Sequence, residues 1–309
     1  MQKTQIKGVL FLLLTAFIWG VAFVAQTVGM ESIGALTFSG VRMLLGAAVL
    51  LPVFLVKNAV TAKKLSPEAL VKRRESNRRT WIYGAILGLV FCVASNLQQF
   101  SLLDTAPGKV AFITAIYIFF VPLIGLFLKK RISAIMWFCV ALGFVGLYFL
   151  CFDGSAIGGM SIGDLLALGC ALAFAVHILL IERFVSEADG LLLSCVQFLV
   201  SGVISSVLMF IFEKPSWDAI LVAAIPLLYA GVMSCGVAYT LQIIGQKYTE
   251  STMASLIMCM ESVFAVLAAM VLLEDMMSGR EIFGCVVMFI AITLPQIVTI
   301  IKERKENKD

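Results

Sequence analysis

Long apolar stretches alternate with short polar ones along almost the whole chain. The clearest apolar runs cover residues 9–28, 36–56, 134–152 and 283–301. An α-helix rises about 1.5 Å per residue, so about 20 residues cross the roughly 30 Å of hydrocarbon in a bilayer. These runs are apolar on all sides, whereas a helix that covers a soluble core keeps a polar face. The pattern therefore predicts helices that span a membrane.

The apolar runs and the polar breaks between them predict ten spans. Their expected bounds are residues 8–29, 34–56, 81–103, 107–128, 133–152, 162–182, 190–212, 217–242, 251–273 and 280–301. Most connections are short, and the polar segment 57–80 is predicted as a long loop. The first span follows two lysines, as in a signal peptide, but its apolar run is too long for one and lacks a clear cleavage site, so we expect it to be retained.

Composition agrees with an all-α membrane protein. Of the 309 residues, 61% are hydrophobic and 14% are charged, against roughly 45–50% and about 25% in soluble domains. The eight cysteines lie in or beside apolar runs, form no CxxC pair and have no histidine at metal-ligand spacing. We therefore expect small packing residues, with no disulfide framework, metal site or cofactor.

The basic residues predict an orientation. With the first residue inside the cell, 19 of the 23 lysines and arginines fall in cytoplasmic segments, three fall on the opposite side, and Arg42 lies within a span. Cytoplasmic loops of membrane proteins carry an excess of lysine and arginine, so both chain ends are predicted to be cytoplasmic and the number of spans even. This distribution explains the net charge of +4 without a nucleic-acid partner. The basic segment 57–80 either sets the topology alone or also binds anionic lipid head groups.

The two halves of the chain align weakly with each other. A shift of 155 residues pairs Ser39 with Ser194, and a shift of 144 residues pairs Gln98 with Gln242. A longer basic connection in the first half accounts for the difference between the two shifts. The alignment favours an internal repeat.

Charge supports an inverted arrangement of these repeats. Five spans per half is an odd number, so the second half would enter the membrane upside down. The connection Lys129–Arg131 is basic and its counterpart at 273–275 is acidic, as opposite orientations require. We therefore predict two inverted five-helix repeats, residues 1–152 and 153–309, a plan that recurs in transporters.

Motifs within the spans indicate a family. The first span contains Trp19-Gly20 within an apolar run, the second carries Arg42 in the stretch Ser-Gly-Val-Arg-Met-Leu-Leu-Gly, and the ninth begins its second half with Glu261-Ser-Val-Phe-Ala. With these motifs the chain resembles the drug/metabolite transporter superfamily, specifically its ten-helix EamA-like members, over nearly its whole length. Serine at 262 replaces the family's proline.

The resemblance implies more than composition shows. It implies two five-helix repeats around a central cavity and a secondary transporter, often an exporter of amino acids or related metabolites. It also implies a multi-pass protein of a bacterial cytoplasmic membrane, whose partners are a small solute and the lipid bilayer. It leaves the oligomeric state open.

Charged or titratable residues inside spans are candidates for the solute pathway, because a charge in the bilayer centre costs about 2.5–3.5 kcal/mol on insertion scales. Glu261 either lines the cavity as a protonatable carboxylate or bonds a neighbouring helix. His177 either binds solute and relays a proton or is an interhelical hydrogen-bonder. Arg42 either holds a solute carboxylate or is structural, pairing with Glu31 or Asp104 or reaching the head groups.

Uncharged polar residues add weaker candidates. Amides cluster in the third span and recur in the eighth, where they could line a central site or join helices. Aromatic residues that share the expected cavity face could equally be packing residues. These candidates are Trp19, Asn96, Gln98, Gln99, Tyr117, Tyr239 and Gln242.

The sequence bears on three function classes. The chain has no GxxxxGK[ST] motif for nucleotide hydrolysis, so a transporter would use a proton or ion gradient, exchange or the solute gradient. A membrane-embedded enzyme is disfavoured because the spans lack a Ser-His set or an aspartate pair. A channel or a non-transporting scaffold is the remaining alternative, although no filter-like polar loop is visible.

Overall fold

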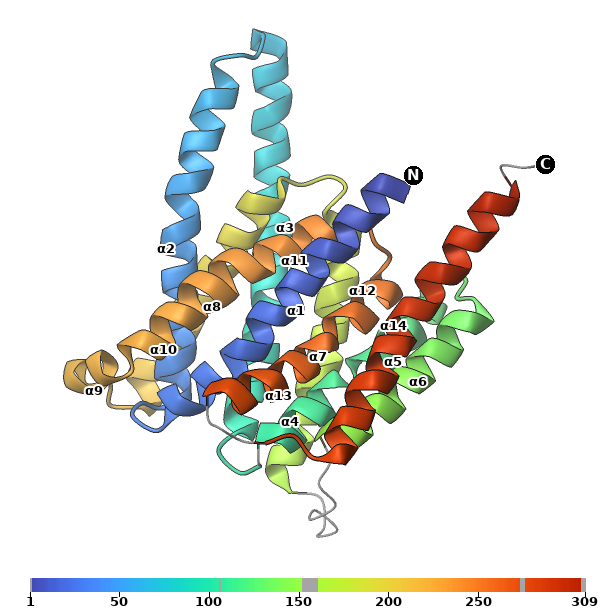
Figure 1. Ribbon diagram of the computed structural model, residues 1–309. Helices are drawn as coiled ribbons and strands as arrows, with labels where there is room; N and C mark the ends of the chain where they lie inside the picture. The colour runs from blue at the N-terminus through green and yellow to red at the C-terminus, as the bar shows by residue number, and fades with distance from the viewer. Residues whose placement is uncertain (1, 106, 152–160, 273–275, 307–309) are drawn as a thin grey trace.

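The computed structural model describes residues 2–105, 107–151, 161–272 and 276–306. Within these ranges the chain forms a bundle of helices and has no β-strand (Figure 1). The elements are α1 (Gln2–Met30), α2 (Ala35–Ala62), α3 (Pro67–Ser101), α4 (Pro107–Ala115), α5 (Tyr117–Phe127), α6 (Ala134–Cys151), α7 (Ile162–Phe184), α8 (Gly190–Phe212), α9 (Trp217–Val222), α10 (Ala224–Leu228), the π-helix η1 (Tyr229–Ala238), α11 (Tyr239–Gln246), α12 (Ser251–Met258), α13 (Met260–Leu272) and α14 (Gly279–Glu306).

Nine helical segments of the described chain are long and apolar enough to cross a membrane. The segment Ala134–Leu150 is also apolar but shorter. The outer surface is apolar as well: Phe127, Phe212 and Trp217 are 88%, 73% and 79% exposed. Such a surface is unfavourable in water and suits lipid. The prediction of a polytopic, all-helical membrane protein is confirmed, and the tenth span stays a prediction.

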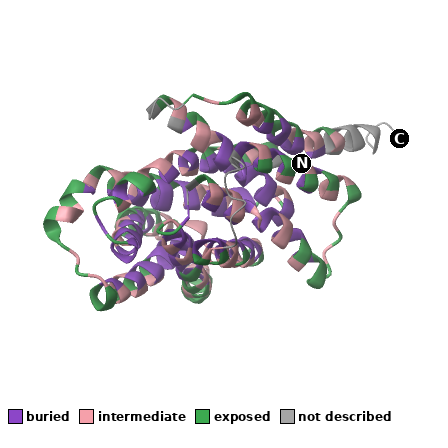
Figure 2. Cartoon of the chain, turned by 90° about the horizontal axis from the view of Figure 1, so that it is seen from below, coloured by how far each residue is buried: buried purple, intermediate pink, exposed green. Residues whose placement is uncertain are grey.

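Buried residues fill the middle of the bundle, and exposed residues lie on its outside (Figure 2). The largest buried cluster joins Leu12, Ile118 and Leu147 of the first half with Ile257 and Met288 of the second half. The two halves of the sequence therefore share a hydrophobic core.

Three predicted spans are interrupted. The span at 107–128 is divided into α4 and α5 at Ile116, and the span at 251–273 is divided into α12 and α13 at Cys259. In the span at 217–242, α9 ends at Val222, four residues before Pro226, which has no N–H to bond the Val222 carbonyl. Broken helices are tolerated at membrane depth where protein or a cavity surrounds them.

The segment 57–80 is mostly helical, so the predicted long loop is wrong. α2 continues to Ala62, α3 starts at Pro67, and only a short turn joins them. The Ser66 hydroxyl caps α3 by accepting a hydrogen bond from the Ala69 N–H at 3.3 Å. Lysine, arginine, glutamate and alanine favour helix, and proline is well placed at its first position, so polarity alone did not imply a loop.

The first and the last described helix extend to the same side of the bundle. The start of α1 and the end of α14 lie at the same end as the protruding α2–α3 turn (Figure 1). The acidic connection at 273–275, predicted as the counterpart of Lys129–Arg131, lies outside the described residues.

Candidate functional site

A pocket lies in the middle of the bundle, between helices from both halves of the sequence. Its empty volume is about 530 Å³, space open to solvent included. Its walls come from α1, α2, α3, α4, α5, α7, η1, α11, α12 and α13. All three interrupted spans contribute to it, through α4–α5, η1–α11 and α12–α13.

Seven of the ten residues predicted from the sequence line this pocket. They are Trp19, Arg42, Gln98, Tyr117, Tyr239, Gln242 and Glu261. His177, Asn96 and Gln99 are not among the lining residues. The sequence reasoning missed three polar lining residues, Gln26, Thr114 and Ser234. Gln26 could have been found by the rule that selected the other amides, since it lies inside an apolar span.

Arg42 is buried, and two neighbouring helices hold its guanidinium. Its Nη1 donates to Gln26 Oε1 at 2.9 Å, and its Nη2 donates to Ser95 Oγ at 2.6 Å. The guanidinium also lies 5.5 Å from the ring centre of Phe38. Arg42 is 5% exposed and forms no ion pair with Glu31, Asp104 or another described carboxylate. It is a buried cation without a protein anion in the described part of the chain.

Glu261 is the second residue of α13, directly after the break at Cys259. It is 7% exposed, and one carboxylate oxygen accepts a hydrogen bond from the Tyr117 hydroxyl at 3.5 Å. Tyr117 is the first residue after the other break. Two of the interrupted spans therefore bring a carboxyl group and a phenol into contact at the pocket.

Close packing of α1 on α13 explains the Trp19-Gly20 motif. A Cβ atom at Gly20 would collide with Phe264 and the backbone of Ala265. Glycine permits this close approach of two helices in a membrane. The neighbouring Trp19 packs against Tyr239 of α11, with ring centroids 4.5 Å apart, and both residues line the pocket.

Amides of α11 continue the polar wall. Gln242 Nε2 donates to Gln246 Oε1 at 3.1 Å, and Gln246 Nε2 donates to the Ile178 carbonyl at 2.9 Å. Within the described chain, Trp19 Nε1, Arg42 Nε and Gln242 Oε1 are buried and have no hydrogen-bond partner. Buried polar atoms are normally hydrogen-bonded, so the pocket retains capacity for further polar contacts.

His177 bonds a neighbouring helix instead of facing the pocket. Its Nε2 lies 3.0 Å from Gln197 Oε1, and its ring packs against Phe91, with centroids 5.6 Å apart. Gln197 is the residue that the shift of 155 pairs with Arg42. The contact between Arg42 and Gln26 and the contact between Gln197 and His177 therefore join matched helix pairs, α1 with α2 and α7 with α8.

Two other predicted residues also join helices. Asn96 Nδ2 donates to the Cys92 carbonyl of its own helix and to Ser205 Oγ of α8, both at 2.8 Å. Gln99 Nε2 contacts the sulfur of Met30 in α1. In the described part of the chain, no cluster of three or more His, Cys, Asp or Glu side chains could hold a metal ion.

Known proteins share both the sequence pattern and the fold. The EamA-like transporter family matches residues 6–152 and 161–295. An uncharacterized transporter of Archaeoglobus fulgidus is 26% identical over 291 residues, which cover 92% of this chain and 83% of the relative. The uncharacterized transporter YwfM of Bacillus subtilis is 25% identical over 289 residues, covering 92% and 91%.

A solved structure titled "Crystal structure of protein" superposes with a TM-score of 0.76 at 17% identity, covering 94% of this chain and 96% of that one. At this identity the match shows the fold. The family assignment comes from the match to the EamA-like sequences, which extends over most of the chain. This chain is a membrane protein that belongs to the EamA-like transporter family.

Proposed function

We propose that the protein is a secondary transporter that exports small zwitterionic metabolites, such as amino acids, by alternating access through the central pocket. The observation that carries this proposal is that the Arg42 guanidinium and the Glu261 carboxyl group line one pocket without forming an ion pair with each other. A solute with an anionic and a cationic group would complement both.

The cost of burying charge supports the proposal. A buried charge is strongly unfavourable unless a partner compensates it. In the described chain Arg42 has two neutral partners and an unpartnered Nε, and Trp19 Nε1 is a second unpartnered donor of a residue that lines the same pocket. Glu261 and Gln242 Oε1 supply acceptors. We infer that the donors bind the solute's anionic group and the acceptors bind its ammonium.

We further propose that ten spans form two inverted repeats, residues 1–152 and 153–309, with both chain ends in the cytoplasm of a bacterial cell. Matching contacts support the repeats. A Cβ atom at Gly8 would meet Thr249, and one at Gly163 would meet Thr105. The shifts of 155 and 144 pair these glycines and these threonines.

We propose that Glu261 couples transport to a proton gradient. It is a buried carboxylate of a discontinuous helix, in contact with the solute pocket, and intramembrane carboxylates commonly serve as proton relays. Protonation would remove the negative charge that binds the solute's ammonium. Solute and proton would then compete for the same site.

Counterflow tests the proposed function. Purified protein is reconstituted in liposomes preloaded with an unlabelled amino-acid mixture, and entry of labelled amino acids is followed. We expect saturable entry that exceeds entry into liposomes without internal amino acids. Flux that does not saturate would indicate a channel, and no flux for amino acids or other polar metabolites would contradict transport altogether.

A further inference from the structure

Helices α2 and α8 pack side by side in opposite directions, and they come from different halves of the sequence. Gly40 of α2 lies against Ser206 of α8, and Leu44 of α2 lies against Gly202 of α8. The contacts therefore advance by four residues along α2 while they go back by four residues along α8. Nearer the end of α2, Phe54 shares a buried cluster with the first turns of α8. Small residues at these positions allow the helices to approach closely. The two helices are therefore in contact along most of their length.

At one end of the α2–α8 pair, Glu213, the residue after α8, links the two helices. Its Oε1 accepts from the Leu36 N–H at 2.8 Å, and its Oε2 accepts from the Thr37 N–H at 2.8 Å and from the Thr37 hydroxyl at 2.6 Å. These N–H groups begin α2 and have no partner within the helix. The positive end of the helix dipole also favours a carboxylate there. Glu213 thus joins the end of α8 to the start of α2.

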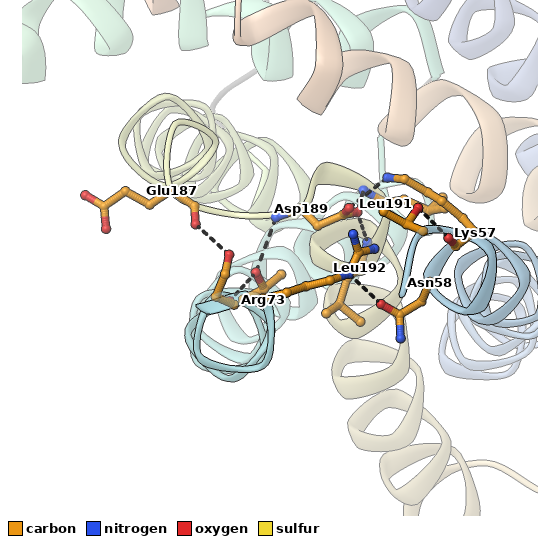
Figure 3. Close-up of polar contacts among 10 residues, drawn as sticks. Lys57, Asn58, Arg73, Glu187, Asp189, Leu191 and Leu192 are labelled. Atoms are coloured by element: carbon orange, nitrogen blue, oxygen red, sulfur yellow. Dashed lines mark hydrogen bonds and ion pairs between the residues drawn. The ribbon is translucent and has the colours of Figure 1, made fainter. Parts of the chain in front are cut away.

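The other end is fastened by an ion pair between Lys57 of α2 and Asp189, the residue before α8 (Figure 3). Lys57 Nζ lies 2.7 Å from Asp189 Oδ2, and Asp189 Oδ1 accepts from the Leu191 and Leu192 N–H groups at 3.0 and 3.2 Å. Burial raises the pKa of Asp189, but Lys57 and the two backbone donors outweigh burial and lower the pKa below its ordinary value. Asp189 is therefore ionised at neutral pH.

The two links between α2 and α8, at Glu213 and at the Lys57–Asp189 ion pair, occupy corresponding positions in the two halves of the sequence. The shift of 155 residues pairs Leu36 and Thr37 with Leu191 and Leu192. At each place a carboxylate binds the first N–H groups of a helix and is tied to the antiparallel partner. Each tie also joins the first half of the sequence to the second half. A movement that separates α2 from α8 would have to break both.

We infer that α2 and α8 stay clamped together throughout the transport cycle, as one rigid unit that takes one helix from each half. This inference rests on the proposed transport function. The moving parts are then not the two halves of the sequence. Access to the pocket changes through elements outside the α2–α8 unit.

Cross-linking tests the inference. Lys57→Cys and Asp189→Cys are combined, and the two thiols are joined by a short bismaleimide before counterflow of a labelled amino-acid mixture is measured. Lys57 and Asp189 are partly exposed, with 50% and 21% of their side chains accessible, so the reagent reaches them. Each single variant treated with the reagent controls for modification alone. The positive control is a Ser234→Cys variant whose thiol is labelled inside the pocket. Its loss of flux shows that the assay detects blocked transport.

We expect the cross-linked protein to keep more than half of the flux of the same variant before cross-linking. A larger loss of flux on cross-linking, absent from the treated single variants, would overturn the inference. The proposed transport function would still stand in that case. Absence of flux from the native protein would remove the proposed function and, with it, this inference.

A second measurement needs no substitution. Hydrogen exchange is followed at the amides of Leu191 and Leu192 in the native protein, with and without the amino-acid mixture. Continued protection is expected. Exchange that rises when the mixture is added would overturn the inference.

Discussion

The hydroxyl of Tyr117 lies 3.5 Å from a carboxylate oxygen of Glu261, and the two residues occupy matched positions in the two halves of the chain. Each follows a break in its membrane span, at Ile116 and at Cys259. Discontinuous helices commonly surround transport sites near the bilayer midplane. The contact therefore joins positions that correspond in the two halves, although their side chains differ: one is a phenol and the other a carboxylic acid.

Replacing Glu261 by glutamine should remove the pH dependence of transport. The amide keeps the shape of the side chain but cannot release a proton, so initial flux at two external pH values should become equal. His177→Gln is the matched control, because His177 bonds Gln197 outside the set of pocket-lining residues. Flux by the control should keep the native pH profile. A Glu261→Gln protein with an unchanged profile would exclude proton coupling through this carboxylate.

Removing the Gln26 amide should destabilise the protein, because Arg42 Nη1 would lose its acceptor. Gln26→Leu should lower the free energy of unfolding by about 1–3 kcal/mol, the usual cost of leaving a buried donor unpaired. Thermal unfolding in detergent measures this. Gln296→Leu is the control, since the Gln296 amide bonds only the Ile292 carbonyl of its own helix in the described structure. Equal stability of the two variants would contradict a supporting role for Gln26.

Much of the fold could be predicted from the sequence, because lipid requires long apolar helices whatever their packing. The same rule could not find the breaks at Ile116 and Cys259, since neither residue is a proline or glycine. Polarity also misled at 57–80, where helix-forming residues continue α2 and α3 beyond the apolar spans.

The candidate site was predictable only in part. A polar residue in an apolar span must face protein or a cavity, and this argument found Arg42 and Glu261. It could not separate Gln98, which lines the pocket, from Gln99, which contacts Met30. Neighbouring residues on a helix face different directions, and the packing of surrounding helices decides which direction is the pocket.

Adding one methyl group at Gly20 should disturb the contact between α1 and α13. A Cβ atom there meets Phe264 and the Ala265 backbone, and overpacking typically costs about 1–3 kcal/mol. Gly20→Ala should therefore lower the unfolding temperature and the flux. Gly169→Ala is the matched control, because a Cβ atom at Gly169 would make only an ordinary contact, 3.4 Å from Leu97. Similar stability of both variants would show that α1 and α13 are not packed so closely.

The Lys57–Asp189 pair should stabilise the protein at neutral pH but not in strong acid. The pKa of Asp189 is lowered in the folded protein. Its stabilising contribution is therefore present at pH values above its pKa in the unfolded chain, about 3.9, and is lost as the pH falls through its lower pKa in the folded protein. Because both groups are partly exposed, Lys57→Gln should cost no more than about 1 kcal/mol at neutral pH. Unfolding of native and variant proteins across a pH series measures the difference. A difference that persists unchanged in acid would contradict the ion pair.

Recognition of opposite charges in one pocket is tested most directly by comparing an amino acid with its amide, which lacks the carboxylate. Counterflow of both compounds is measured for the native protein and for Arg42→Gln. The native protein should prefer the amino acid by at least about tenfold, because a buried donor site rejects an analogue that leaves it unpaired. Arg42→Gln should lose that preference, whereas a variant that still transports and keeps the full preference would contradict the account.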